Sequence, residues 1–175
     1  MTNSNATAAA TTVQAGQIVT GKITGLAIYG VFVRIDAATR ALLHVSQLAG
    51  HTFQEREARL KALKFNDTIQ AMVTEVTQPE AGSKKPVRVS ISERALATHR
   101  AKESAARNPG AIMTLEVKRP VSDGLILRLT GGAEAFLSEE SLKGVSKESI
   151  MKSRRTRVRL TDATDERGRV IAVKA

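Results

Sequence analysis

The feature that most limits how this chain can fold is an internal repeat, in which the second half follows the first at a constant offset of 94 positions. The segment Gly30-Val-Phe-Val-Arg-Ile35 is matched by Gly124-Leu-Ile-Leu-Arg-Leu129, and Ala41-Leu-Leu43 is matched by Ala135-Phe-Leu137. At this one offset, both halves have glycines at the same turns and the same alternation of inward and outward positions across three strands. Such agreement rarely arises by chance. We therefore predict a tandem duplication of one small β unit.

Alternating hydrophobicity predicts the strands of that unit. In residues 30–35 the two valines and the isoleucine share one strand face, while Phe32 and Arg34 lie on the other. Further strands are predicted over residues 17–24, 41–45, 68–76 and 86–91. Five short strands within about eighty residues favour a small closed barrel or a sandwich over an α/β fold.

Two helices are also predicted. Residues 53–63 fit a short helix between the third and fourth strands, and residues 92–107 fit an alanine-rich helix that connects the units rather than entering a core. The second helix follows Ser90 and Glu93, which have capping-box spacing, and it ends before Gly110. The chain then divides into a disordered tail (1–15), a first barrel (16–91), a linker helix (92–109) and a second barrel (110–175).

The charge of the chain indicates the class of its partner. A net charge of +10, from 27 basic and 17 acidic residues, favours a polyanion. The alternatives are a basic surface that serves solubility and attraction to anionic lipid. No apolar run approaches the roughly 18 residues of a membrane span, and no basic amphipathic helix with an aromatic face is present. Nucleic acid is therefore the expected partner, and we expect no membrane association.

The residue types argue against catalysis. The chain has no cysteine, and its three histidines (His44, His51 and His99) do not have the spacing of metal ligands. It also lacks a phosphate-binding glycine loop with its lysine and an acid–base pair. We therefore expect no metal, no cofactor and no enzymatic activity. Residues 1–15 lack the basic and apolar regions of a secretory signal, so we expect a cytoplasmic protein.

Two aromatic residues of the first unit are suited to binding a flexible nucleic-acid strand. Exposed rings can stack on bases, and cationic side chains can contact phosphates. Phe32 shares its strand face with Arg34, and Tyr29 stands at the turn before Gly30. The alternatives are that Phe32 closes one end of a barrel and that Tyr29 packs on a neighbouring loop.

The second unit lacks this set and carries a different one. At the offset of 94, Asp123, Ile126 and Ser138 replace Tyr29, Phe32 and His44. Arg155, Arg157 and Arg159 would line one face of a strand, at about 6.7 Å spacing. This secondary basic stripe either follows a nucleic-acid backbone or is a solvated strand face.

Three segments together give the first unit a family resemblance: Gly16-Gln-Ile-Val-Thr-Gly21, Ile28-Tyr-Gly-Val-Phe-Val33 and Leu42-Leu-His-Val-Ser46. In this order and spacing they resemble the S1 RNA-binding domain family, whose members are oligonucleotide-binding (OB-fold) barrels. The second unit resembles the family weakly, as a degenerate repeat. The resemblance implies an all-β fold of two tandem five-stranded barrels.

The resemblance also implies which residues contact RNA. In similar domains two aromatic residues and a histidine lie on one face with basic side chains, which points to Tyr29, Phe32, His44 and Arg88. Lys84 and Lys85, in the loop before Arg88, are either phosphate contacts or solvated charges. The sequence departs from the family at Ala41, at Thr77 and in the longer loop 78–86, which leaves the role of that loop open.

These patterns lead to two functional hypotheses. The first is a non-catalytic protein that binds single-stranded RNA through stacking and phosphate contacts, in translation or in RNA decay. The second is a protein-interaction module that docks on a ribosome or on an RNA-processing assembly. Binding of an unstructured RNA by the first barrel would separate them.

Overall fold

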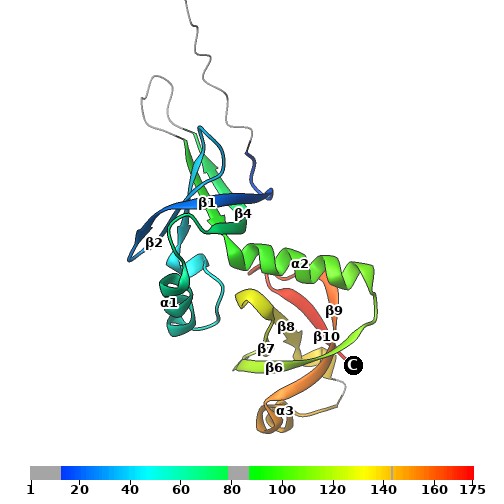
Figure 1. Cartoon of the computed structure of the whole chain (residues 1–175). Helices are drawn as coiled ribbons and strands as arrows, with labels where there is room; N and C mark the ends of the chain where they lie inside the picture. The colour runs from blue at the N-terminus through cyan, green and yellow to red at the C-terminus, as the bar shows by residue number, and fades with distance from the viewer. Residues whose placement is uncertain (1–12, 79–86, 143) are drawn as a thin grey trace, which may run out of the picture.

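Each repeat forms its own closed five-stranded barrel (Figure 1). The computed structural model describes residues 13–78, 87–142 and 144–175. The first barrel has the strand order β1-β2-β3-β5-β4, in which β3 and β5 are parallel and the other pairs antiparallel. Its strands are β1 (Ile18–Ala27), β2 (Gly30–Arg34), β3 (Arg40–His44), β4 (Thr68–Thr77) and β5 (Arg88–Ser92).

The second barrel repeats this topology strand for strand. Its order is β10-β8-β7-β6-β9, and its one parallel pair joins β8 to β10. Its strands are β6 (Ile112–Val121), β7 (Gly124–Arg128), β8 (Glu134–Ser138), β9 (Arg155–Thr164) and β10 (Val170–Lys174). The register is repeated as well, since Phe32 pairs with Leu42 and Ile126 with Phe136. The predicted fold of two tandem barrels joined by a helix is confirmed.

The repeat keeps a glycine at the start of β2 and of β7 because no side chain fits there. A Cβ at Gly30 would overlap the carbonyl oxygen of Leu43, and a Cβ at Gly124 would overlap that of Leu137. Both strand pairs therefore depend on a close backbone approach that only glycine allows.

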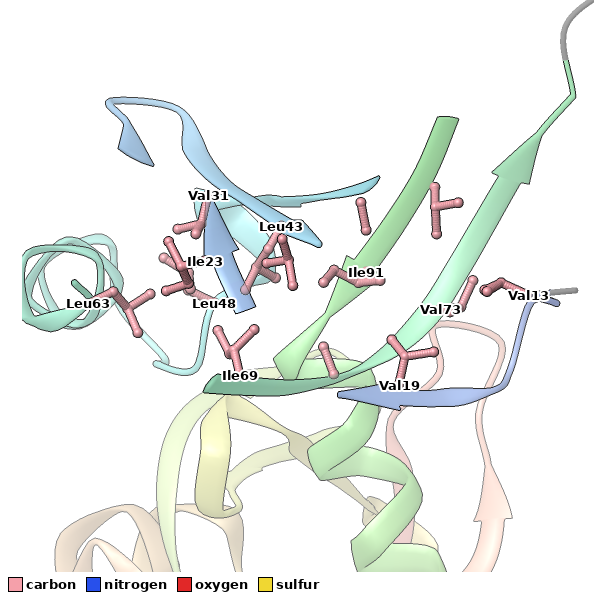
Figure 2. Packing of buried hydrophobic residues seen from close by; sticks show 14 residues of the cluster. Val13, Val19, Ile23, Val31, Leu43, Leu48, Leu63, Ile69, Val73 and Ile91 are labelled. Carbon is pink, nitrogen blue, oxygen red and sulfur yellow. The ribbon is translucent and has the colours of Figure 1, made fainter. Parts of the chain in front are cut away.

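The core of the first barrel is a continuous line of aliphatic side chains between the strands (Figure 2). Leu63 lies at one end of this core, beside the helix α1 (Phe53–Ala62), and Val13 lies at the opposite end. Val13 is 9% exposed. Val13 was predicted to lie in the disordered tail, but it belongs to the core, because burial of its side chain holds the chain against the barrel.

The helix α2 (Glu93–Arg107) starts differently from the expected capping box. Ser90 lies inside β5, and Ser92 is the cap, since its hydroxyl accepts a hydrogen bond from the Ala95 amide at 3.0 Å. The Glu93 carboxylate instead accepts from the Ala49 amide at 2.8 Å and pairs with Arg59 at 2.7 Å. The first turn of α2 is thereby fixed to the first barrel.

The same helix also forms part of the second barrel's packing. Ala97, Ala101 and Ala105 recur every four residues along α2 and pack against the second core. The expectation that this helix connects without entering a core is therefore wrong. Small side chains carry little hydrophobic signal, yet they let the helix lie close to β9 and β10.

A second contact joins the barrels directly, near the short helices η1 (Val45–Gln47) and η2 (Thr130–Gly132). Gly132 lies so close to Gly50 that a Cβ would be 2.6 Å from the Gly50 nitrogen. Arg94 donates to the Gly132 carbonyl at 3.1 Å, and the His51 Nε2 lies 2.8 Å from the Leu129 carbonyl oxygen. Together with α2, these contacts hold the two barrels in one arrangement.

His51 makes this contact sensitive to pH. Burial lowers the pKa of His51 below 6.5; the hydrogen bond to Leu129 and the charge of Glu55 oppose this, and Lys118 and Arg128 reinforce it. The folded state therefore disfavours the protonated imidazole. The contribution of neutral His51 is complete above pH 6.5 and is lost as the pH falls from 6.5 through the lowered pKa.

We expect the wild-type protein to unfold at a lower urea concentration at pH 5.5 than at pH 7.5. The variant His51→Asn, which does not titrate, should show a smaller fall over the same interval, and urea titrations of both proteins at the two pH values would measure it. His44 and His99 remain in both proteins as internal controls. The same pH dependence in the two proteins would show that His51 is not responsible.

Candidate nucleic-acid interface

Two rings lie together on the outer face of the first barrel. Phe32 points outward from β2 and is 37% exposed, and Tyr29, in the turn before it, is 47% exposed. Their ring centroids are 6.1 Å apart with an interplanar angle of 89°. The Phe32 ring lies against Gly25 of β1, where a Cβ would be 3.4 Å from the ring. The Phe32 ring therefore packs along β1 at the surface, within van der Waals distance of position 25.

His44 lies on the same outer face. It pairs with Gly30 across β2 and β3. Along β3 the exposed Arg40 and His44 and the half-buried Leu42 alternate with the buried Ala41 and Leu43. The His44 Nδ1 is 2.9 Å from the Ser46 hydroxyl oxygen, which fixes the orientation of the imidazole. Tyr29, Phe32 and His44 therefore lie on one side of the barrel, and their contact with RNA stays a prediction.

A row of four cationic side chains crosses this face next to the rings. Lys22 of β1 pairs with Arg34 of β2, and Arg34 pairs with Arg40 of β3. Arg88 continues the row on β5, because β3 and β5 are parallel and Ala41 pairs with Val89, each one residue further along. All four side chains are exposed, and the structure gives none of them an ion pair within residues 13–78 and 87–142.

The rings and two of the cations line one groove of about 840 Å³. Its lining includes Tyr29 and Phe32, the cations Arg40 and Arg88, and Leu42 and Ser90, which pair across β3 and β5. Among the described residues, Glu75 is the one acidic side chain that lines it. A groove with apolar flat surfaces and positive charge can hold bases and phosphates of one strand at once.

The sequence analysis found part of this set. Arg34 lies on the predicted face but borders a neighbouring groove with Lys22 and Phe65. Lys84 and Lys85 lie outside the described residues. Lys22 and Arg40 were missed, although period-two alternation along β3 places Arg40 with His44 once the strand is known to begin at Arg40.

The corresponding face of the second barrel is closed. Ile126, which replaces Phe32, is fully buried. Phe136, which replaces Leu42 and was not singled out in the sequence, lies beneath Arg169, whose guanidinium carbon is 5.0 Å from the ring centroid. This cation–π contact covers the one ring on that face, so the second barrel presents no open stacking surface there.

The basic stripe of the second barrel has the predicted alternation but is only partly open. Arg155 and Arg157 are exposed on β9, where they alternate with buried residues. Arg159 is half-buried and lines a cavity with Ala105 and Ala106 of α2. The helix thus covers one end of the stripe.

The described residues contain neither a metal-binding cluster nor a membrane-spanning helix. Within residues 13–78, 87–142 and 144–175, no group of three histidine, aspartate or glutamate side chains could hold a metal ion. Over the same part of the chain, no helix is long and apolar enough to span a membrane.

Comparison with known proteins identifies the first barrel's family. The S1 RNA binding domain model matches residues 12–83. General stress protein 13 of Bacillus subtilis (strain 168) is 32% identical over 104 residues, which are 59% of this chain and 73% of that protein. The small ribosomal subunit protein bS1 of Synechococcus elongatus is 35% identical over 88 residues, 50% of this chain and 26% of bS1.

Other matches are to parts of larger proteins. A polyribonucleotide nucleotidyltransferase of Dehalococcoides mccartyi is 31% identical over 98 residues, 56% of this chain but 13% of the enzyme. Among solved structures, that of GSP13 from Bacillus subtilis has 32% identity and a TM-score of 0.38, and the match covers 48% of this chain and 58% of that one. The chain therefore spans a small part of the ribosomal protein and of the enzyme.

Proposed function

Because the chain belongs to the S1 RNA-binding domain family, we propose that its first barrel binds single-stranded RNA on the outer face of β2, β3 and β5. One observation carries the proposal: Tyr29 and Phe32 are exposed 6.1 Å apart beside a row of cations on the same face. The relatives support a setting in translation or RNA metabolism.

The rings bind bases without selecting among them. Every base has a π face, so a stack on Phe32 tolerates any base and contributes about 1–3 kcal/mol. Tyr29 meets Phe32 edge to face, which leaves the two rings at right angles for successive bases. His44, held by Ser46, adds a third flat surface and a polar edge for hydrogen bonding.

The cation row binds the backbone. Neighbouring strands are about 4.8 Å apart, so four cations on four strands cover about 14 Å along the face. Lys22, Arg34, Arg40 and Arg88 can therefore neutralise several consecutive phosphates while the bases turn toward the rings.

Salt dependence tests the backbone contacts. We expect the affinity of the full chain for an unstructured RNA oligomer to fall steeply with salt, because each neutralised phosphate releases a counterion. The double variant Arg40→Gln/Arg88→Gln should reduce the slope of log K against log salt by about 1.4, at about 0.7 per phosphate of a single strand. Fluorescence anisotropy over a salt series would measure this change.

A matched variant distinguishes position from net charge. The variant Arg155→Gln/Arg157→Gln also removes two positive charges, but from the exposed part of the basic stripe on the second barrel. We expect that variant to keep the wild-type slope. The opposite result would refute the proposal. If the salt slope fell in the Arg155/Arg157 variant and stayed unchanged in the Arg40/Arg88 variant, the RNA would lie on the second barrel.

A further inference from the structure

A polar pocket of about 270 Å³ lies between the two barrels and is lined by arginines from both sides. The first barrel's side of it consists of Gln47 at the end of η1 and the first turn of α2, including Arg94. The second barrel's side consists of η2, β6 and the turn between β9 and β10. The second side contributes Arg119, Arg167 and Arg169.

Two of these arginines are available to a ligand. Arg169 pairs with Asp165 at 2.6 Å, and Arg94 donates to the Gly132 carbonyl at 3.1 Å. Arg119 and Arg167 are exposed, and no ion pair to either is found in the described part of the chain.

Glu134, the one acidic residue that lines the pocket within the described parts of the chain, does not neutralise them. Glu134 pairs with Lys118 at 2.6 Å. Burial raises the pKa of Glu134, but the hydrogen bond and charge of Lys118, with the charge of Arg94, lower it overall. The carboxylate is therefore already matched by cations, and the pocket keeps a positive excess.

Two connections join the pocket to the outer face of the first barrel. Ser46 links the two places, because its hydroxyl oxygen is 2.9 Å from the His44 Nδ1 and its carbonyl accepts from the Arg94 Nη1 at 3.5 Å. β5 runs the same way, from Arg88 and Ser90 in the groove to Ser92 at the pocket. The pocket arginines therefore lie beyond His44, on the side away from the rings, along the course of β5.

We propose that this pocket binds the sugar–phosphate backbone of the same RNA strand, beyond the nucleotides on Tyr29 and Phe32. The inference rests on the proposed function of the first barrel. Small-molecule pockets typically measure about 300–1,000 Å³, so this smaller and highly charged space fits a phosphodiester group better than a base or a cofactor. Arg119 and Arg167 supply the forked donors that match phosphate oxygens.

The test compares short and long RNA. The full chain is titrated with an unstructured four-nucleotide RNA, which covers the ring face alone, and with a twelve-nucleotide RNA, which also reaches the pocket. In the variant Arg119→Gln/Arg167→Gln, affinity for the long RNA should fall roughly tenfold, with a salt slope lower by about 1.4. Affinity for the short RNA should stay within twofold of wild type.

A matched variant controls for net charge. Lys61→Gln/Arg107→Gln removes two exposed cations from α1 and α2, with side chains 74% and 75% exposed. It should lose little affinity for either RNA. Circular dichroism and the melting temperature of each variant would establish that it is folded.

The outcomes separate the pocket from the ring face. If wild type binds both RNAs and the Arg119/Arg167 variant matches the Lys61/Arg107 variant, the pocket proposal is overturned and the function of the first barrel stands. If wild type binds neither RNA, both are overturned. If the Arg119/Arg167 variant keeps its RNA affinity but loses binding to a polyglutamate peptide, the pocket serves an acidic protein segment, which also overturns the proposal.

Discussion

Replacement of Phe32 with alanine is expected to weaken binding of an unstructured RNA oligomer by roughly 5- to 150-fold, since one aromatic–base stack contributes about 1–3 kcal/mol. Phe32 is held in place by its neighbours, because its ring packs against Gly25 and beside Tyr29. The double variant Tyr29→Ala/Phe32→Ala should lose more, because it removes both flat surfaces. Fluorescence anisotropy at one fixed salt concentration would measure both variants.

Phe53 offers a matched control for this experiment. It is a phenylalanine at the start of α1, it is 64% exposed, and it does not line the groove. Phe53→Ala should bind RNA as wild type does. Equal affinities of wild type and Tyr29→Ala/Phe32→Ala would contradict the proposed function, whatever the behaviour of the cation variants.

The largest effect on stability is expected at the centre of the first core. Leu43 is fully buried between the strands (Figure 2), so Leu43→Ala should lower the free energy of unfolding by about 2–5 kcal/mol through lost burial and the cavity left behind. Leu137, its counterpart in the repeat, is also fully buried and should show a loss in the same range. Urea denaturation followed by circular dichroism would measure both.

An exposed leucine tests whether burial is the cause. Leu26, near the end of β1, is 47% exposed, so Leu26→Ala should change the free energy of unfolding by well under half as much. Similar losses for Leu26→Ala and Leu43→Ala would show that position in the core does not decide the effect.

The fold could be predicted from sequence because its signal is local and occurs twice. Alternation around Phe32 sets which residues of β2 point inward, and the repeat applies the same assignment to β7. The prediction of a capping box at Ser90 and Glu93 was wrong, because spacing alone does not show where a strand ends. Ser90 satisfies the spacing, but β5 continues to Ser92, which caps the helix instead.

The site could be predicted only in part, because much of it depends on contacts between distant segments. The row formed by Lys22, Arg34, Arg40 and Arg88 exists only once four strands are paired in register. The cover over Phe136 comes from Arg169, 33 positions later in the sequence. No local pattern reports which side chains meet in this way.

Closure of the barrels has a consequence for colloidal behaviour. Every strand within residues 13–78, 87–142 and 144–175 has a neighbour on both sides, so no described strand is the edge strand of an open sheet. The β1–β2 turn nevertheless holds Ile28, which is 94% exposed, next to Tyr29. Exposed apolar side chains at that tip favour aggregation less than they would beside the edge strand of an open sheet, where cross-β pairing can begin.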